Sequence, residues 1–407
     1  MTKAPTHKWT FGARFRRHAY GWKSQPAIKR IKEAVSEIKK EAPQDPLLAA
    51  EGAVLFLEKV SPAIEQVDSS SGAIGTAVNN AIAVLVEFIA EAPADADTRA
   101  KWLERLWDAY QDDEIPYLES LGDYWGELCA SPEVASHWAD ELIGTCRTAW
   151  SPDPELRRYF KGTPNCLSAL IAAGRYEELL ELLDMAPYKM WHYRKYGVKA
   201  LAAMGRTAEA IRYAEAGRGL NDSPIAIARA CEELLLASGL AEEAYEKYGL
   251  VANQAGTYLA WFRAVAKKYP YKAKAEVLAD LVAHTPGEEG KWFAAAKSAK
   301  LFDEAIELAN RTPCSPQTLT RAARDFEEKN PTFALEAGMA ALRWLVEGYG
   351  YDITGADVLA AYSHTMKAAG HAGVEDETRA RIRELVSREA FGDRFVTPIL
   401  SRYLEHS

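Results

Sequence analysis

The sequence lacks the features that mark several common classes of protein. Its five cysteines are scattered without a CxxC pair, so neither a disulfide framework nor a zinc site is indicated, and a reducing cytoplasm is the expected compartment. No HExxH motif occurs among the eight histidines. We find no apolar run that approaches the roughly 20 residues of a membrane span. We therefore expect no membrane contact, no metal and no cofactor.

The basic start of the chain is followed by no hydrophobic segment that could act as a secretory signal. An organelle transit peptide has a similar basic, acid-poor composition, and this alternative stays open. Pro26 and the regular helical pattern after it favour mature structure instead.

Alternation of polar and apolar residues with period two is almost absent, and this argues against a sheet-based fold. Capping side chains stand close to prolines instead, which is typical of helix starts. The sequence thus predicts an all-α protein. After the arm of residues 1–25 we expect a helical N-terminal region over residues 26–150, with helices over residues 26–41, 46–59, 73–91, 97–110, 114–129 and 132–148.

A repeated pattern begins near residue 165. The aligned segments are LIAAGRYEELLELL from Leu170, ALAAMGRTAEAIRYA from Ala200, LLLASGLAEEAYEKY from Leu234 and AAAKSAKLFDEAIELA from Ala294. Their turns fall at Gly174, Gly205, Gly239 and Lys300, and two further units turn near Pro270 and Asn330. Because a single hairpin cannot bury its apolar face alone, these units predict an α-solenoid of helical hairpins.

The turns GRYEEL, GRTAEA and GLAEEA resemble the start of the second helix in the tetratricopeptide class. The signature Trp of that class is missing from most units, and the closing proline is seen only in places such as Pro187, Pro286 and Pro313. The resemblance implies a tetratricopeptide-like array over residues 165–375 and a C-terminal helical cap over residues 376–407. It carries over no peptide-binding residues.

The opening segment, together with FLEKVSPAIEQVDSSSGAIGTAVNNAI from Phe56, also looks like a bacterial family of helical-repeat proteins of unknown function. This second resemblance implies helical structure and no site residues.

Residues 1–25 form a basic, aromatic arm. Residues 1–40 carry about +9, and since the chain totals −9, about −18 is left for the rest. Candidate partner-binding residues in the arm are Arg14, Arg16, Arg17 and Trp22. The arm could pack its rings under the first hairpins, bind a protein, or bind RNA or DNA, which the acidic remainder disfavours.

A second candidate patch is PYKMWHYRKYG, residues 187–197. It places the partner-binding candidates Lys189, Trp191, Arg194 and Lys195 among three tyrosines. Rings interleaved with cations suit a single-stranded nucleic acid or the rim of a partner site. On a helix, however, several of these rings would fill the joint between repeats.

The segment VDSSSGAIGTAVNN, residues 67–80, is a candidate anion site. Ser69, Ser70, Ser71 and Thr76 stand at a helix start, where N–H groups and hydroxyls can bind phosphate or carboxylate. The segment is neither a P-loop nor a GxSxG elbow. Alternatively, one serine caps the helix of an ordinary interhelical loop. We identify no catalytic residues, because the acids of residues 110–128 lack a second catalytic element.

The expected function is non-enzymatic. Repeat arrays present large binding faces, so we expect a scaffold or adaptor that holds a protein or peptide on the solenoid face. The alternatives are a nucleic-acid-binding accessory protein that uses the basic arm, and an enzyme with a site in the Ser69–Thr76 loop.

Overall fold

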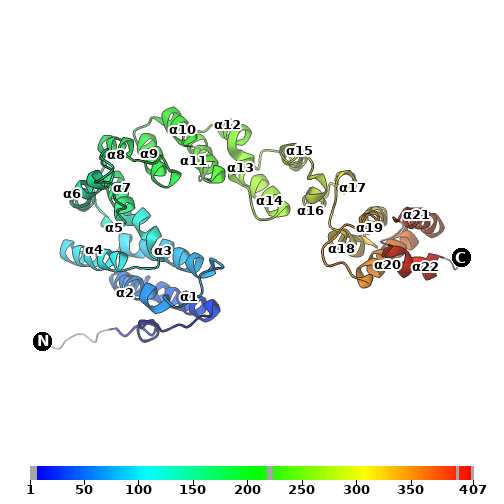
Figure 1. Ribbon diagram of the computed structural model, residues 1–407, viewed down its shortest axis with the longest axis horizontal. Helices are drawn as coiled ribbons and strands as arrows, with labels where there is room; N and C mark the ends of the chain where they lie inside the picture. Colours follow the sequence, from blue (N-terminus) through cyan, green and yellow to red (C-terminus); the bar gives the residue numbers. More distant parts are fainter. Residues whose placement is uncertain (1–6, 218–222, 391–393, 405–407) are drawn as a thin grey trace. The chain divides into compact units, whose positions relative to one another are not determined.

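The computed structural model describes residues 7–217, 223–390 and 394–404 (Figure 1). Within these ranges the chain is helical and contains no strand, which confirms the all-α prediction. The helices pack mainly against their neighbours in sequence. The chain divides into two compact units, residues 1–223 and 224–407, so the boundary expected between residues 150 and 164 falls inside the first unit.

The first unit begins with the expected N-terminal helices. They are α1 (Ser24–Glu41), α2 (Pro46–Ile64), α3 (Ala73–Glu91), α4 (Ala96–Gln111), α5 (Trp125–Cys129) and α6 (Pro132–Ala149), with the short 3₁₀ helices η1 (Phe11–Ala13) and η2 (Glu119–Tyr124). A capping side chain stands just before the first residue of α2, α4 and α6. The caps are Asp45, Asp95 and Ser131, and each side chain accepts the backbone N–H three residues further on. All the predicted helices of this region except that over residues 114–129 are confirmed to within a few residues.

The predicted helix over residues 114–129 is wrong. Residues 112–118 form a loop that leads into η2 and α5. The buried carboxylate of Asp113 accepts the Ser61 hydroxyl and, at 2.8 Å, the N–H of Leu118, and burial raises the pKa of this carboxyl. Pro116 lies inside the same loop and cannot donate a helical hydrogen bond. The hydrogen bonds of Asp113 and the missing N–H of Pro116 therefore favour a loop where a helix was expected to begin.

Two helical hairpins complete the first unit. They are α7 (Thr163–Ala172) with α8 (Tyr176–Asp184), and α9 (Trp191–Ala203) with α10 (Thr207–Glu215). Helix α7 also packs against α5 and α6. Gly126 of α5 permits this approach, because a Cβ there would lie 2.4 Å from the carbonyl oxygen of Ser168. One cluster of buried apolar residues extends from Trp9 to Ala200.

The second unit is a series of helices in which neighbours again pack together. It contains α11 (Pro224–Ala237), α12 (Ala241–Ala244), the π-helical turn η3 (Tyr245–Gly249), α13 (Leu250–Ala252), α14 (Tyr258–Lys268), α15 (Lys274–His284), η4 (Glu289–Trp292), α16 (Phe293–Ser298), α17 (Phe302–Arg311), α18 (Pro316–Phe326), α19 (Pro331–Val346), α20 (Gly355–Ala372), α21 (Glu375–Ser387) and α22 (Val396–Leu404). The expected C-terminal cap thus contains α21 and α22, and its residues 391–393 and 405–407 lie outside the described residues.

The hairpin turns lie at the positions that the repeats predict. Left-handed φ angles occur at Gly174, Gly205, Gly239 and Lys300, with values of 71°, 76°, 75° and 64°. Helix pairs also turn between α14 and α15 and between α18 and α19, as predicted near Pro270 and Asn330.

These left-handed turns share one hydrogen-bond pattern. Gly174 donates its N–H to Ile171, and Arg175 donates to Leu170. The equivalent pairs recur at Gly205, Gly239 and Lys300, so all four are Schellman motifs. The same motif occurs at Gly373 between α20 and α21, a position that the repeated sequence pattern did not predict.

One helix among the described residues, α3, is long and apolar enough to cross a membrane by length and composition. Its apolar residues are interrupted by Asn79, Asn80 and Glu87, so it is not an uninterrupted apolar run of that length. The helix packs against α1 and α2, and 39% of its apolar window is buried in the fold. A helix in the core of a helical protein passes the same test, so the finding is weak evidence for a membrane span.

Candidate functional site

The basic arm is folded against the first two helices. The rings of Trp9, Phe11 and Phe15 are buried. Phe11 and Phe15 meet the ring of Phe56 in α2 edge to face, with centroids 5.8 and 5.1 Å apart. Gly52 of α2 makes room for Trp9, because a Cβ there would lie 2.3 Å from the indole. The rings of Trp9, Phe11 and Phe15 are thus part of the core.

Two of the arm's candidate arginines pair with acids of the helices beneath. Arg14 lies 3.1 Å from Glu33 of α1, and Arg17 lies 3.7 Å from Glu65. The side chains of Arg14 and Arg17 are 46% and 69% exposed, so these ion pairs contribute little to stability. They do hold the cations close to the body of the protein.

Arg16 and Trp22 lie at the surface. Arg16 donates from Nε to the carbonyl oxygen of Ala13 at 2.9 Å, and the side chain of Trp22 is 72% exposed. Binding of a nucleic-acid strand uses several rings on which successive bases stack. Since Trp9, Phe11 and Phe15 are buried, the arm presents mainly Trp22 for such stacking.

The segment Ser69–Thr76 runs from an exposed loop into the first turn of α3, and its polar groups are largely bonded within the segment or to Asp68. Gly72, with a φ of 69°, precedes the first residue of α3. The Thr76 hydroxyl donates to the Gly72 carbonyl at 2.9 Å, and the Asp68 carboxylate accepts the N–H of Ser70 at 3.0 Å. A carboxylate of the chain itself therefore occupies part of the predicted anion site, while Ser71 accepts the N–H of Ala73 at 3.4 Å. Ser69 is exposed as well.

Arg194 and Lys195 make contacts inside the first unit. Arg194 is 6% exposed, donates to the carbonyl oxygen of Tyr213 in α10 and lies 3.8 Å from the centroid of that ring. Lys195 donates to both carboxylate oxygens of Asp123 at 2.7 Å. Tyr196 donates to the same carboxylate, and burial together with this negative charge raises the pKa of its hydroxyl. These side chains join α9 to α10 and to η2.

The other two candidates of the patch lie near its surface. Lys189 is exposed, and Trp191 is half-buried at the first residue of α9. The patch predicted from sequence is therefore divided: residues 188–190 are exposed, whereas Arg194 and Tyr196 in α9 are buried.

An aromatic cleft lies beside the exposed part of this patch. It is lined by residues from 149–160, at the end of α6 and just after it, and by residues from 187–193, just before α9 and in its first turn. Its volume is about 440 Å³. The inner part contains the buried ring of Trp150 and the half-buried ring of Tyr193, in edge-to-face contact at 5.1 Å. The outer part contains Tyr159 and Tyr188, which are 76% and 67% exposed. A concave, mostly apolar cavity of this size is typical of ligand sites.

Two arginines of the connecting segment also line the aromatic cleft. Arg157 donates to the carbonyl oxygens of Ser151 and Pro152 at 2.9 and 3.1 Å, so its guanidinium group braces its own loop. Arg158 donates from one terminal nitrogen to the carbonyl oxygens of Glu155 and Arg157. Neither arginine forms an ion pair with a carboxylate of the described residues.

Sequence reasoning missed Arg157, Arg158, Tyr159 and Phe160. The prolines and acids of Ser151–Leu156 indicate a break between domains, so the residues after them are not expected to meet the patch at residues 187–197. The signal available was compositional: RRYF repeats the mixture of cations and rings seen in PYKMWHYRKYG. The fold brings these two segments together around one cleft.

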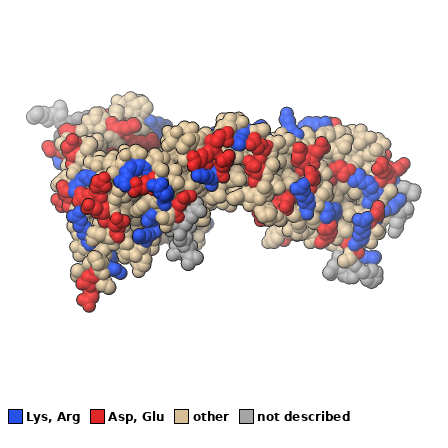
Figure 2. Space-filling model, turned by 90° about the horizontal axis from the view of Figure 1, so that it is seen from above, with Lys and Arg blue, Asp and Glu red and all other residues tan. Residues whose placement is uncertain are grey.

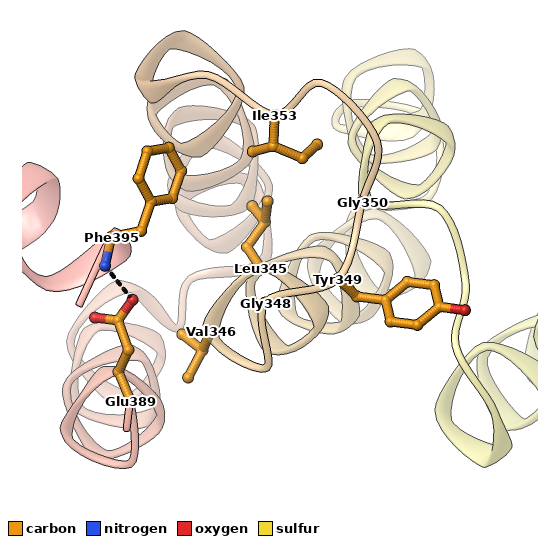
Figure 3. Close-up of a pocket in the computed structure, with 8 residues that line it drawn as sticks. All are labelled: Leu345, Val346, Gly348, Tyr349, Gly350, Ile353, Glu389 and Phe395. Carbon is orange, nitrogen blue, oxygen red and sulfur yellow. Dashed lines mark hydrogen bonds between the residues drawn. The ribbon is translucent and has the colours of Figure 1, made fainter. Parts of the chain in front are cut away.

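A smaller cavity of about 290 Å³ lies in the second unit (Figure 3). Apolar side chains such as Leu345 and Ile353 line it together with Glu389. Glu389 accepts the N–H groups of Phe395, Val396 and Thr397 at the start of α22, at 2.8, 2.6 and 2.7 Å. Although burial acts to raise it, hydrogen bonds from Thr397 and from these N–H groups lower the pKa of Glu389. The carboxylate thus has a structural role as a helix cap.

The cysteines and the acidic clusters add no further site. All five thiols are buried, and burial raises the pKa values of Cys129 and Cys314 to about 12, where little thiolate forms at neutral pH. No group of three or more His, Cys, Asp or Glu side chains in the described residues could hold a metal ion.

No protein-family model matches this chain, and the search of curated proteins likewise gave no match.

Proposed function

We propose that this protein is a non-enzymatic scaffold or adaptor that holds a segment of a protein partner in the aromatic cleft. The observation that carries the proposal is the exposure of Tyr159 and Tyr188, which both line a mostly apolar cavity. Aromatic side chains are enriched at the centres of protein interfaces, because they bury a large area at a small cost in conformational entropy.

The arrangement of the helices supports a scaffold. We infer a tetratricopeptide-like solenoid, because the Schellman turns recur at the aligned positions from Gly174 to Lys300 and the helices pack on their sequence neighbours. Free, buried cysteines fit a reducing compartment, and we propose that the protein acts in the cytoplasm. The scaffold proposal thus rests on the repeated hairpin turns and on the aromatic cleft.

Nucleic-acid binding by the arm has less support. The arm's rings are mostly buried and its arginines Arg14 and Arg17 are paired. On the face drawn in Figure 2, acidic and basic side chains are interspersed. A phosphate backbone is attracted by clustered cations, so this distribution favours a protein partner.

Site-specific photocrosslinking tests the proposed function. A photoreactive phenylalanine analogue replaces Tyr188 at the cleft, and in a control protein it replaces Tyr351, which is 87% exposed in the second unit. We expect the Tyr188 position to crosslink to a discrete protein in cells, with no effect of nuclease treatment. Identical crosslinks from both positions, or crosslinks that vanish with nuclease, would contradict the scaffold proposal.

A further inference from the structure

We propose that the occupant of the aromatic cleft is an extended acidic peptide segment that carries one aromatic or large apolar side chain. This inference rests on the proposed function and specifies the chemistry of the partner. It follows from the shape of the inner cleft and from the charges at its entrance.

The inner cleft suits one large apolar side chain. The ring of Trp150 is buried, Tyr193 meets it edge to face, and Phe160 and Met190 add apolar surface to the lining. Aromatic rings prefer edge-to-face contacts such as this one, and they attract a further ring or apolar group in the same way. A phenylalanine or leucine side chain entering the cleft therefore finds rings on several sides.

The charged side chains that line the cleft are cationic, although the carboxylate of Glu119 outside the lining also acts on the rings of Tyr159 and Tyr193. The charged side chains that line it are Arg157 and Arg158, and no acid is among the described lining residues. Lys189 is exposed between two lining residues, Tyr188 and Met190. This is a local positive charge on a protein whose total charge is −9, so it favours an acidic partner.

The arginines still have donors to offer to a carboxylate. A guanidinium group has five N–H donors. Arg158 uses one terminal nitrogen for Glu155 and Arg157, so its Nε and its other terminal nitrogen make no hydrogen bond within the described residues. These two nitrogens form the planar edge that binds a carboxylate with two parallel hydrogen bonds. Such an edge beside an apolar cavity fits a side chain such as Phe next to Glu or Asp.

A peptide fits these observations better than a nucleic-acid strand. A strand needs cations along its backbone. Two of the three cations in the sequence patch, Arg194 and Lys195, are bound to Tyr213 and to Asp123. The cations that remain form a short entrance rather than a groove, which matches one or two acidic side chains.

Fluorescence anisotropy with the full chain tests this inference. The probe is fluorescein-labelled Glu-Glu-Phe-Glu-Glu, and matched peptides replace Phe by Ala or all four Glu by Lys. We expect the Glu-Glu-Phe-Glu-Glu peptide to bind at least about tenfold more tightly than either matched peptide, a difference of about 1.4 kcal/mol. Added salt should weaken binding, because the entrance contacts are charged.

Two double variants locate the contact. Arg157→Ala with Arg158→Ala should weaken binding about tenfold or more. Arg324→Ala with Arg388→Ala removes the same charge from exposed positions of the second unit and should leave the affinity unchanged. Circular dichroism checks that both variants keep their helices.

Three outcomes would overturn the inference. They are equal binding of the Lys peptide, unchanged affinity in the Arg157/Arg158 variant, and tighter binding of a single-stranded oligothymidine than of the peptide. If crosslinks to a protein from position 188 persist while the acidic peptide does not bind, the partner has another chemistry and the scaffold proposal stands. If both experiments fail, the cleft is not a partner site.

Discussion

At the scale of single residues, similar cations in this chain have different environments. Lys189 and Arg194 belong to the same sequence patch, yet Lys189 is exposed and Arg194 is buried on the ring of Tyr213. The composition of the patch is visible in the sequence. Which cation faces inward depends on where α9 begins and on how α9 packs against α10. This information comes from tertiary contacts, so the individual site residues could not be assigned from the sequence.

Glu389 is a second residue whose role is set by its surroundings. Its carboxylate accepts three backbone N–H groups and the hydroxyl of Thr397 at the start of α22. We expect Glu389→Gln to lower the free energy of unfolding of the second unit by about 1–2 kcal/mol at pH 7, because an amide is a weaker acceptor than a carboxylate.

The pH dependence of this effect has a definite sign. The folded pKa of Glu389 is lowered from an ordinary value of 4.5, so the stabilisation is present above that value and is lost as pH falls through the folded pKa. Urea unfolding of the original protein and the variant should therefore converge at acidic pH. A difference that stays constant from pH 7 to pH 3 would show that Glu389 acts through packing alone.

At the scale of elements, the hairpin turns were predictable and the loop at residues 112–118 was not. Glycine before a new helical pattern marks a left-handed turn locally, and the turns at Gly174, Gly205 and Gly239 have that conformation. The loop depends on Asp113, whose partner Ser61 is distant in sequence. A local sequence pattern therefore predicts the glycine turns, but it does not predict a loop that depends on a partner distant in sequence.

Lys300 has the turn conformation that glycine has in the equivalent units, with a φ of 64°. A side chain in this conformation costs about 1 kcal/mol. We expect Lys300→Gly to stabilise the second unit by about 0.5–1 kcal/mol. We expect Gly239→Ala, at the same position of another hairpin, to destabilise it by about 1 kcal/mol.

Thermal and urea unfolding measure both changes, and the pair serves as its own control. The two substitutions should shift the midpoint in opposite directions. A shift of both midpoints in the same direction would mean that surface charge or local packing, rather than backbone conformation, decides the stability of these turns.

At the scale of the whole molecule, the chain consists of two units that each contain buried helices. The apolar cluster from Trp9 to Ala200 lies entirely within residues 1–223. The charge asymmetry of the sequence drew attention to the arm. The sequence could not show that the arm's rings complete this cluster, because their partners Gly52 and Phe56 lie in another helix.

We expect fragments 1–223 and 224–407 to fold separately, because each has the length of an ordinary domain and its own buried contacts. Circular dichroism should show helical spectra and cooperative urea unfolding for both fragments. The sum of the two spectra should reproduce that of the full chain. A fragment that is unfolded or that aggregates would contradict the division into two units.

The seating of the arm on α2 also has a consequence during protein synthesis. The rings of the arm emerge from the ribosome before α2, which they pack against. Trp9 lies against Gly52 of that helix, and Phe11 and Phe15 lie against Phe56. At a translation rate of about 5–20 residues per second, these rings stay uncovered for some seconds. During that interval the nascent chain presents a cationic, aromatic segment of the kind that chaperones bind, and the emergence of α2 ends it.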